Sequence, residues 1–337
     1  MVAKKKISIL TAVLLTMSIF GGCGKPQDTK EKSLSDKETI KIGITQIIEH
    51  PALDKSREGF IDALKSKGFE DGKNIKIDYQ NAQGDMPTTQ SIAKDFVSKK
   101  EDIIFAVATP SAQAAFNATK EIPILITAVT DPVDAGLVKS IEKPGTNVTG
   151  TSDIVPIEDQ LQLLKKIMPK AKKVGILFNT SENNSQIQVQ NIKNAAPKFE
   201  LEVMESSITN VNEVPQALNS LLEKVDVLYT PTDNTVASAM TMISNECFKK
   251  NIPIIGAERA HVTGGALATI GIDYYKLGFQ TGLLAVDIIN GKKPSEMPIE
   301  TLEQMQLVIN EDSVKKLNLN IPKELIEKAE MVKKGDK

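Results

Sequence analysis

The stretch IIFAVATPSAQAAF, residues 103–116, decides how this chain folds. Residues 103–108 are apolar or small, as in a strand that is buried on both faces of a parallel sheet. Thr109, Pro110 and Ser111 follow and suit the first turn of a helix, where proline is tolerated and hydroxyl groups can cap free N–H groups. The pattern therefore predicts a strand that runs into a helix N-terminus. In open α/β sheets, ligands bind beyond the carboxyl ends of such strands, and helix N–H groups favour an anion there.

The same alternation of strand and helix continues along the chain. Further strands are predicted at residues 40–45, 74–82, 122–129, 174–179, 201–208, 225–231, 252–257, 266–273 and 305–309, and helices at 53–67, 87–99, 156–167, 185–196, 214–223, 235–249, 275–290 and 312–316. Residues 147–153, NVTGTSD, separate the two series and are predicted to cross between lobes. The fold class is therefore α/β, with two doubly wound parallel-sheet lobes joined by a multi-strand hinge. Lobe I takes residues 39–150 and roughly 273–300, and lobe II takes 151–272 and roughly 301–330.

The first residues predict export and anchoring. Lys4, Lys5 and Lys6 precede an apolar run at residues 7–20, and Gly21-Gly22-Cys23 follows as a small-residue cleavage site. A cysteine at that place looks like the lipobox of a bacterial lipoprotein, so residues 1–23 are interpreted as its signal peptide and Cys23 as the lipidated residue. An ordinary secretory signal with an incidental cysteine is the alternative. Polar residues 24–38 predict a flexible tether, so the body should be held at the extracytoplasmic face of the cell membrane.

Charge and cysteine content narrow the function further. Three of the 41 basic residues lie in the first 23 positions, which leaves 38 against 43 acidic residues, a net charge of −5. Such a balance argues against a nucleic-acid partner. With Cys23 modified, Cys247 is the only other thiol, and it is predicted to be a buried, unbridged residue.

Seven motifs stand in order along the chain: TQIIEHPALDKSREGF (45–60), ATPSAQAAF (108–116), TAVTDPVDAGLV (127–138), NVTGTSD (147–153), NTSENNS (179–185), PTDN (231–234) and GIDYYKLGFQTG (271–282). Together they resemble the ABC-transporter substrate-binding lipoproteins related to tryptophan and tyrosine uptake. The resemblance implies the type I periplasmic-binding-protein fold, no catalysis, and delivery of an aromatic amino acid to an ABC permease. It also implies a monomeric binding protein that needs no cofactor.

Polar residues at strand ends are the candidate ligand contacts. Thr109, Ser111 and Ser185 are predicted to bind a carboxylate, and Asp233 or Asp273 an ammonium group. Glu49, Asn184 and Tyr274 are predicted to frame the side-chain pocket, and Gln46 to border the same crevice. Thr130, Asp131 and Asn234 complete the candidate set. For Asp131, Ser185, Asp233 and Asp273, as for the hydroxyls at 109 and 111, helix capping is the competing interpretation.

Other functions fit the sequence less well. The chain has no Gly-x-Ser-x-Gly elbow, no phosphate loop and no Gly-x-Gly-x-x-Gly, so an enzyme is not expected. His50 and His261 stand apart without metal-ligand spacing, which predicts no metal site and leaves His50 a role in shaping its loop. The open alternatives are the same fold binding a nucleoside, a sugar or a branched-chain amino acid, or a ligand sensor for a membrane receptor.

Overall fold

The computed structural model describes residue 34 and residues 37–336. The predicted signal peptide, the lipidation residue Cys23 and most of the predicted tether lie outside the described residues. Within the described part of the chain, no helix is both long and apolar enough to cross a bilayer.

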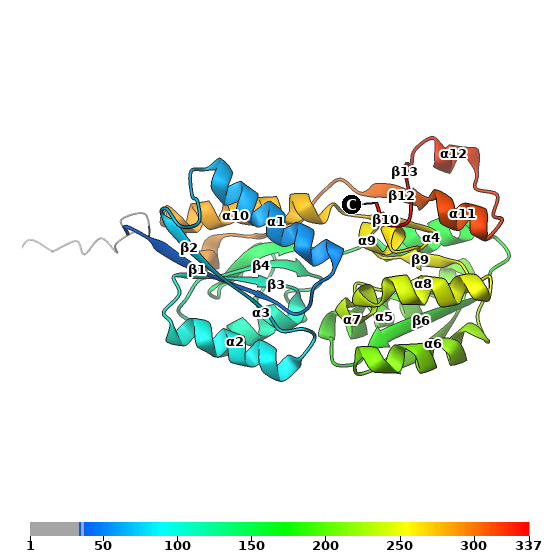
Figure 1. The fold of residues 1–337 in the computed structure, drawn as a ribbon, viewed down its shortest axis with the longest axis horizontal. Coiled ribbons are helices and arrows are strands. Elements are labelled where there is room, and N and C mark those ends of the chain that lie inside the picture. The colour runs from blue at the N-terminus through cyan, green and yellow to red at the C-terminus, as the bar shows by residue number, and fades with distance from the viewer. Residues whose placement is uncertain (1–33, 35–36, 337) are drawn as a thin grey trace, which may run out of the picture. The chain divides into compact units, whose positions relative to one another are not determined.

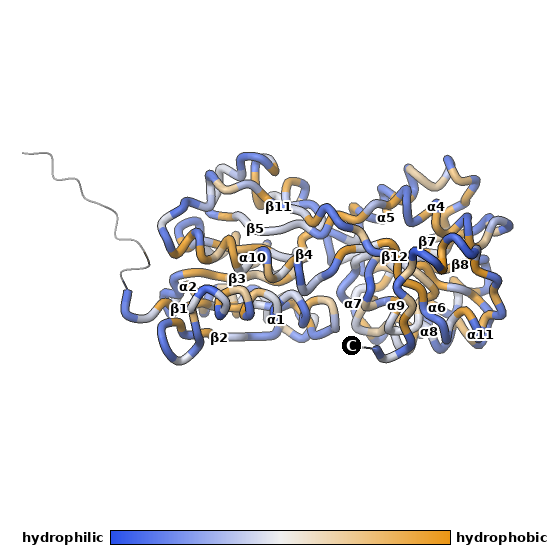
Figure 2. The backbone as a smooth tube through the Cα atoms, turned by 90° about the horizontal axis from the view of Figure 1, so that it is seen from above, coloured by the Kyte–Doolittle hydropathy of each residue, from blue (hydrophilic) through white to orange (hydrophobic). Residues whose placement is uncertain are grey.

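The first sheet forms lobe I. Its strands run in the order β11-β5-β4-β3-β1-β2 and are all parallel. They are β1 (Ile40–Gln46), β2 (Ile75–Asn81), β3 (Ile103–Val107), β4 (Ile124–Val129), β5 (Val148–Ser152) and β11 (Ile299–Glu300), and the helices are α1 (Pro51–Ser66), α2 (Met86–Ser98), α3 (Thr109–Ala118) and α10 (Tyr274–Ile289). Figure 1 shows α1 and α10 on one face of the sheet and α2 and α3 on the other. Every residue of β3 and β4 is buried, and the hydropathy colouring of Figure 2 marks β3 as strongly apolar. The predicted strand and helix at residues 103–116 are confirmed as β3 and α3.

The second sheet forms lobe II. Its order is β13-β12-β10-β9-β8-β6-β7, and only the β10–β12 pair among its described strands is antiparallel. The strands are β6 (Lys173–Asn179), β7 (Glu202–Ile208), β8 (Val227–Thr230), β9 (Ile254–Gly256), β10 (Ala268–Gly271), β12 (Gln306–Asn310) and β13 (Glu330–Val332). The helices are α4 (Ile157–Ile167), α5 (Asn183–Ala195), α6 (Val214–Leu222), α7 (Asn234–Ser238), α8 (Met240–Lys249), α9 (Arg259–Thr263), α11 (Glu311–Lys316) and α12 (Lys323–Ile326).

The chain passes between the sheets after β5, after β10 and after β11, so three segments connect the lobes within residues 37–336. The predicted class, two doubly wound parallel-sheet lobes with several crossings, is confirmed. Cys247 is buried and free, as predicted.

Three local predictions are wrong. Residues 148–152 of the predicted crossover form β5, because they pair with β4 and β11 in sheet register. The single helix predicted at 235–249 is divided at Ala239 into α7 and α8. An additional strand, β13, follows the predicted end of the fold and pairs with β12. Among these segments, β13 is the edge strand of its sheet and pairs with β12 alone.

Glycine lets α1 and α10 approach each other until backbone meets backbone. A Cβ atom added at Gly59 would lie 2.1 Å from the Tyr275 carbonyl oxygen, and one at Gly278 would lie 1.8 Å from the Ser56 carbonyl oxygen. Next to this contact, the Phe60 and Phe105 rings stack 3.8 Å apart. The close packing holds the start of α10, and with it Tyr274, against α1.

Candidate functional site

A narrow cavity of about 10 Å³ lies where the two lobes meet. It is lined by His50, Leu53, Ala128, Asp153, Thr232, Asp233, Asn234, Ala237, Glu258 and Tyr274. Ligand pockets usually span about 300–1,000 Å³. In this closed state the cavity has room for about one water molecule, so an amino acid needs the lobes or the lining side chains to move apart.

The lobes are hydrogen-bonded to each other beside the cavity. The His50 ring, at the start of α1, places Nε2 3.3 Å from Asn234 Oδ1 at the start of α7. The hydroxyls of Thr130 and Thr232 lie 3.1 Å apart across the same boundary. The structure therefore has its lobes closed on the cavity.

Two carboxylates with little hydrogen bonding dominate the cavity wall. Asp153 follows β5 and is 2% exposed, and Glu258 follows β9 and is 3% exposed. The Tyr274 hydroxyl donates to Asp153 Oδ2 at 2.6 Å and also interacts with Glu258. Asp153 Oδ1 has no hydrogen-bond partner among the described residues, and none of the lining residues is Lys or Arg. A buried carboxylate without a cation is costly, so the pair creates a strong preference for a positive group in the cavity.

The ionisation of these carboxyls reflects the lack of a cation. Burial, followed by the nearby charge of Asp153, raises the pKa of Glu258 to about 8. Burial also raises the pKa of Asp153, although the Tyr274 hydrogen bond opposes the shift. At neutral pH without a ligand, Glu258 is therefore mostly protonated, and a bound cation would favour its ionised form.

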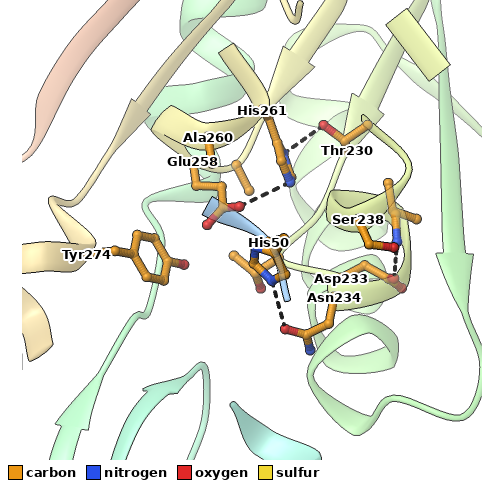
Figure 3. A network of polar contacts seen from close by, with 12 residues as sticks. His50, Thr230, Asp233, Asn234, Ser238, Glu258, Ala260, His261 and Tyr274 are labelled. Atoms are coloured by element: carbon orange, nitrogen blue, oxygen red, sulfur yellow. Dashed lines mark hydrogen bonds and ion pairs between the residues drawn. The ribbon is translucent and has the colours of Figure 1, made fainter. Parts of the chain in front are cut away.

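His261 lies beside Glu258, as Figure 3 shows. Its Nδ1 is 2.9 Å from Thr230 Oγ1, and its Nε2 is 3.3 Å from Glu258 Oε1 without forming a hydrogen bond. Burial lowers the pKa of His261 to about 3 and that of His50 to about 4. Both imidazoles are therefore neutral at physiological pH and supply no cation to the carboxylates.

Three of the residues predicted from the sequence line the cavity: Asp233, Asn234 and Tyr274. The Asp233 carboxylate, however, is used within lobe II, because it accepts from the Asn179 and Val236 N–H groups and from the Ser185 hydroxyl. Burial, followed by the charge of Glu182, raises the pKa of Asp233 to about 7.

Asn184 and Ser185 support the cavity from behind. Asn184 Nδ2 donates to the Thr232 carbonyl oxygen at 2.7 Å, and Ser185 Oγ donates to Asp233 Oδ2 at 2.7 Å. Neither residue lines the cavity. Thr130 does not line the cavity either, but its side chain interacts with two residues that do, Thr232 and Asp153.

Thr109 and Ser111 lie at the start of α3, close to the cavity but outside its lining. Both side chains are buried, and both hydroxyls lack a partner among the described residues. No side chain caps this helix, and its N-cap residue Ala108 has a φ of 76°. The Ala108 N–H donates to the Thr127 carbonyl oxygen, one residue before the cavity residue Ala128. α3 also contacts α5 of the other lobe.

The remaining predicted residues bond elsewhere. Gln46 is hydrogen-bonded to Asp54 and Arg57. Glu49 is exposed and lies 3.4 Å from the Tyr79 hydroxyl. Asp131 accepts hydrogen bonds from two N–H groups of its own turn. Asp273, predicted to face the ammonium, caps α10 by accepting from the Lys276 N–H at 3.1 Å and does not line the cavity.

Sequence reasoning missed Asp153 and Glu258 as charged site residues and gave His50 only a loop-shaping role. The signal was present, since Asp153 ends one of the recognised motifs and Glu258 directly follows a predicted strand. Both obey the strand-end rule that selected the other candidates.

Comparison with known proteins agrees with this geometry. The family model described as "ABC transporter substrate binding protein" matches residues 41–333. A Clostridioides difficile protein named "Tyrosine-binding protein" is 52% identical over 94% of this chain and 93% of its own length. A Streptococcus pneumonia structure in complex with L-Trp is 35% identical, covers 87% of this chain and 99% of its own, and has a TM-score of 0.84.

A third solved structure bears on the conformation. The ligand-free, open structure of a Clostridium difficile substrate-binding protein is 56% identical and covers 88% of this chain and 99% of its own, yet its TM-score is only 0.67. This chain thus matches a ligand-bound structure better than an open one of higher identity, as expected if its lobes are closed. The predicted type I periplasmic-binding-protein fold and the predicted relationship are both confirmed. The chain belongs to the family of ABC transporter substrate-binding proteins.

Proposed function

We propose that this protein encloses an aromatic amino acid, tyrosine foremost, between its lobes and delivers it to the permease of an ABC importer. The observation that carries the proposal is the pair of buried carboxylates, Asp153 and Glu258, in a closed cavity without a lysine or arginine. An α-ammonium group placed between them would favour the ionised form of both carboxyls and donate hydrogen bonds to their unpaired oxygen atoms.

The ligand carboxylate would bind at the start of α3. Thr109 and Ser111 offer buried hydroxyls without partners, and the uncapped helix end offers N–H groups and a favourable dipole. The α-ammonium group of the ligand would then bind the two carboxylates, and its α-carboxylate would bind the positive end of α3. A sugar or a nucleoside carries no ammonium group and would leave both acids unpaired, so these alternatives are weaker.

The aromatic side chain is supported by the relatives. The C. difficile relative carries tyrosine in its name, and the S. pneumonia structure contains L-Trp. In the cavity, Leu53, Ala128, Ala237 and the Tyr274 ring supply apolar contact. Of the other candidates, Asn234 would face the ligand. Gln46, Glu49, Thr130, Asp131, Asn184, Ser185, Asp233 and Asp273 would position the wall or cap its helices.

The proposal includes no catalysis. The lobes would close as two bodies, residues 39–150 with roughly 273–300 and residues 151–272 with roughly 301–330, about the three crossing segments. The protein would act as a monomer held by lipid on Cys23 at the extracytoplasmic face of the membrane. Metabolic labelling with a radioactive fatty acid tests the anchor: label should enter the wild-type protein and be lost in Cys23→Ala.

Two experiments test the ligand. The purified protein is denatured, and the small molecules that it releases are identified by mass spectrometry. Calorimetric titration with Tyr, Trp and Phe then ranks the candidates against leucine, a branched-chain control. Release of an aromatic amino acid and tighter binding of the aromatic series support the proposal. Preferential binding of leucine, or no binding of any of them, contradicts it.

A further inference from the structure

His50 is held by a chain of hydrogen bonds that begins in lobe II at Glu182. This carboxylate is 1% exposed and accepts from the N–H groups of Asn234 and Thr235, each at 3.1 Å, and from the Thr235 hydroxyl at 3.0 Å. It also accepts from the Asn234 side-chain amide, Nδ2. A carboxylate surrounded by donors in this way can only accept, so it fixes which end of the Asn234 amide faces it.

The orientation of Asn234 in turn fixes the proton on His50. With Nδ2 on Glu182, the Oδ1 atom of Asn234 faces His50 Nε2 at 3.3 Å. An amide oxygen is only an acceptor, so Nε2 must carry the hydrogen. Because burial lowers the pKa of His50 to about 4, the ring is neutral and Nδ1 keeps a free lone pair.

No donor in the described part of the chain reaches the lone pair of His50 Nδ1. His50 is 6% exposed and lines the cavity, and its Nδ1 is buried without a hydrogen-bond partner among the described residues. An unmet buried acceptor costs free energy in the empty protein, and a ligand that brings a donor removes this cost.

The surroundings indicate which part of the ligand comes near His50. Leu53 lies one helical turn after His50 in α1, and Ala237 lies one turn after Asn234 in α7, and all four line the cavity. Residues three positions apart share a helix face, so each polar residue adjoins an apolar one. When the lobes open, this side of the cavity would suit a ring with a polar edge, while the ammonium already has two carboxylates, Asp153 and Glu258, to bind.

We propose that His50 Nδ1 accepts a hydrogen bond from a donor on the ligand's ring, the phenolic O–H of tyrosine or the indole N–H of tryptophan, and so selects these ligands over phenylalanine. The inference rests on the proposed function and adds the residue that determines specificity. Asn234 and Glu182 are positioning residues, because they act by fixing the tautomer of the His50 ring.

The test is a ratio of affinities measured by calorimetry. For the wild-type protein, L-tyrosine should bind about tenfold or more tightly than L-phenylalanine. 4-Aminophenylalanine, whose ring carries a donor, should resemble tyrosine, and 4-fluorophenylalanine, whose ring does not, should resemble phenylalanine. In His50→Phe the tyrosine-to-phenylalanine ratio should fall toward one.

Thr130→Val is the matched control, because it removes another of the hydrogen bonds between the lobes and leaves His50 intact. It should weaken both ligands equally and keep the ratio. If His50→Phe does not fold, His50→Leu takes its place, and the analogue series on the wild-type protein needs no variant.

The outcomes separate this inference from the proposed function. Equal affinities of the wild-type protein for tyrosine and phenylalanine overturn the inference alone. A ratio that survives His50→Phe also overturns it, since His50 would then contact the ammonium or only close the lobes. No binding of any aromatic amino acid overturns the proposed function and the inference together.

Discussion

Replacing Glu258 by glutamine should weaken ligand binding while it stabilises the empty protein. Glutamine has nearly the same shape but cannot ionise, so Glu258→Gln removes one of the two charges offered to the ammonium. In the ligand-free protein the same change removes a buried carboxyl that is repelled by Asp153. Function and stability should therefore change in opposite directions.

The structure sets the size of both effects. Breaking a buried ion pair by removing one partner costs about 3–5 kcal/mol. At pH 7 the wild-type protein must first ionise Glu258, whose pKa is about 8, at a cost of about 1.4 kcal/mol. The net loss of binding free energy is thus about 2–4 kcal/mol, or roughly 30- to 1,000-fold in Kd.

For stability, the unfolded carboxyl ionises near its ordinary pKa of 4.5 and the folded one near 8. At pH 7, ionisation of this carboxyl in the unfolded chain therefore lowers the free energy of unfolding by about 3 kcal/mol, the equivalent of about 2.5 pKa units. Glu258→Gln removes that penalty, and about 3 kcal/mol is the upper limit of its stabilisation.

Calorimetry with L-tyrosine measures the first effect, and urea unfolding without ligand measures the second. Glu101→Gln is the control, because Glu101 is 7% exposed and has a pKa raised by burial but lies outside the cavity. It should leave the affinity unchanged. If Glu258→Gln binds tyrosine as tightly as the wild-type protein, the ammonium does not lie at Glu258 and the reasoning fails.

Three further predictions follow from the same geometry. Because Glu258 must lose its proton to meet an ammonium, affinity should rise about ninefold from pH 6 to 7, about fivefold from pH 7 to 8 and then level off. Nearly one proton should be released per ligand at pH 7; calorimetry in buffers of different ionisation enthalpy measures this, and a flat profile would contradict it. Tyr274→Phe removes the hydrogen bond to Asp153 and should weaken tyrosine binding by roughly ten- to a hundredfold, whereas unchanged affinity in a titration would show that the hydroxyl does not organise the acids. Gly278→Ala forces a methyl group against the Ser56 carbonyl and should cost about 3 kcal/mol or more in urea unfolding; an unaltered midpoint would rule out the close approach of α1 and α10.

The regular strands and helices were predictable because short stretches of sequence determine them. A run of apolar residues followed by Thr-Pro-Ser marks β3 and α3 without reference to the rest of the chain. The strand predicted at residues 305–309 is β12, but its antiparallel direction and the three-residue edge strand β13 were not predicted, since both depend on the pairing partner and not on local sequence. The division between α7 and α8 falls at Ala239, a residue with no helix-breaking chemistry of its own.

The cavity acids were harder still, because a strand-end carboxylate can cap the next helix instead of facing a ligand. Asp233 and Asp273 each stand immediately before a helix and accept from the N–H group three residues later. Asp153 has no helix within that reach, since α4 begins at Ile157. Glu258 precedes α9 without capping it, as its longer side chain is a poor cap. Distance to the next helix and side-chain length are thus the signals that separate Asp153 and Glu258 from the helix-capping acids Asp233 and Asp273.

The most direct test of the account is a calorimetric comparison of L-tyrosine with N-acetyl-L-tyrosine. Acetylation keeps the ring and the carboxylate but removes the positive charge that Asp153 and Glu258 are proposed to bind. We predict one L-tyrosine bound per protein and no measurable binding of the acetylated form at the same concentration. Equal binding of both compounds, or of neither, would contradict the claim that this cavity is built around an amino acid's ammonium group.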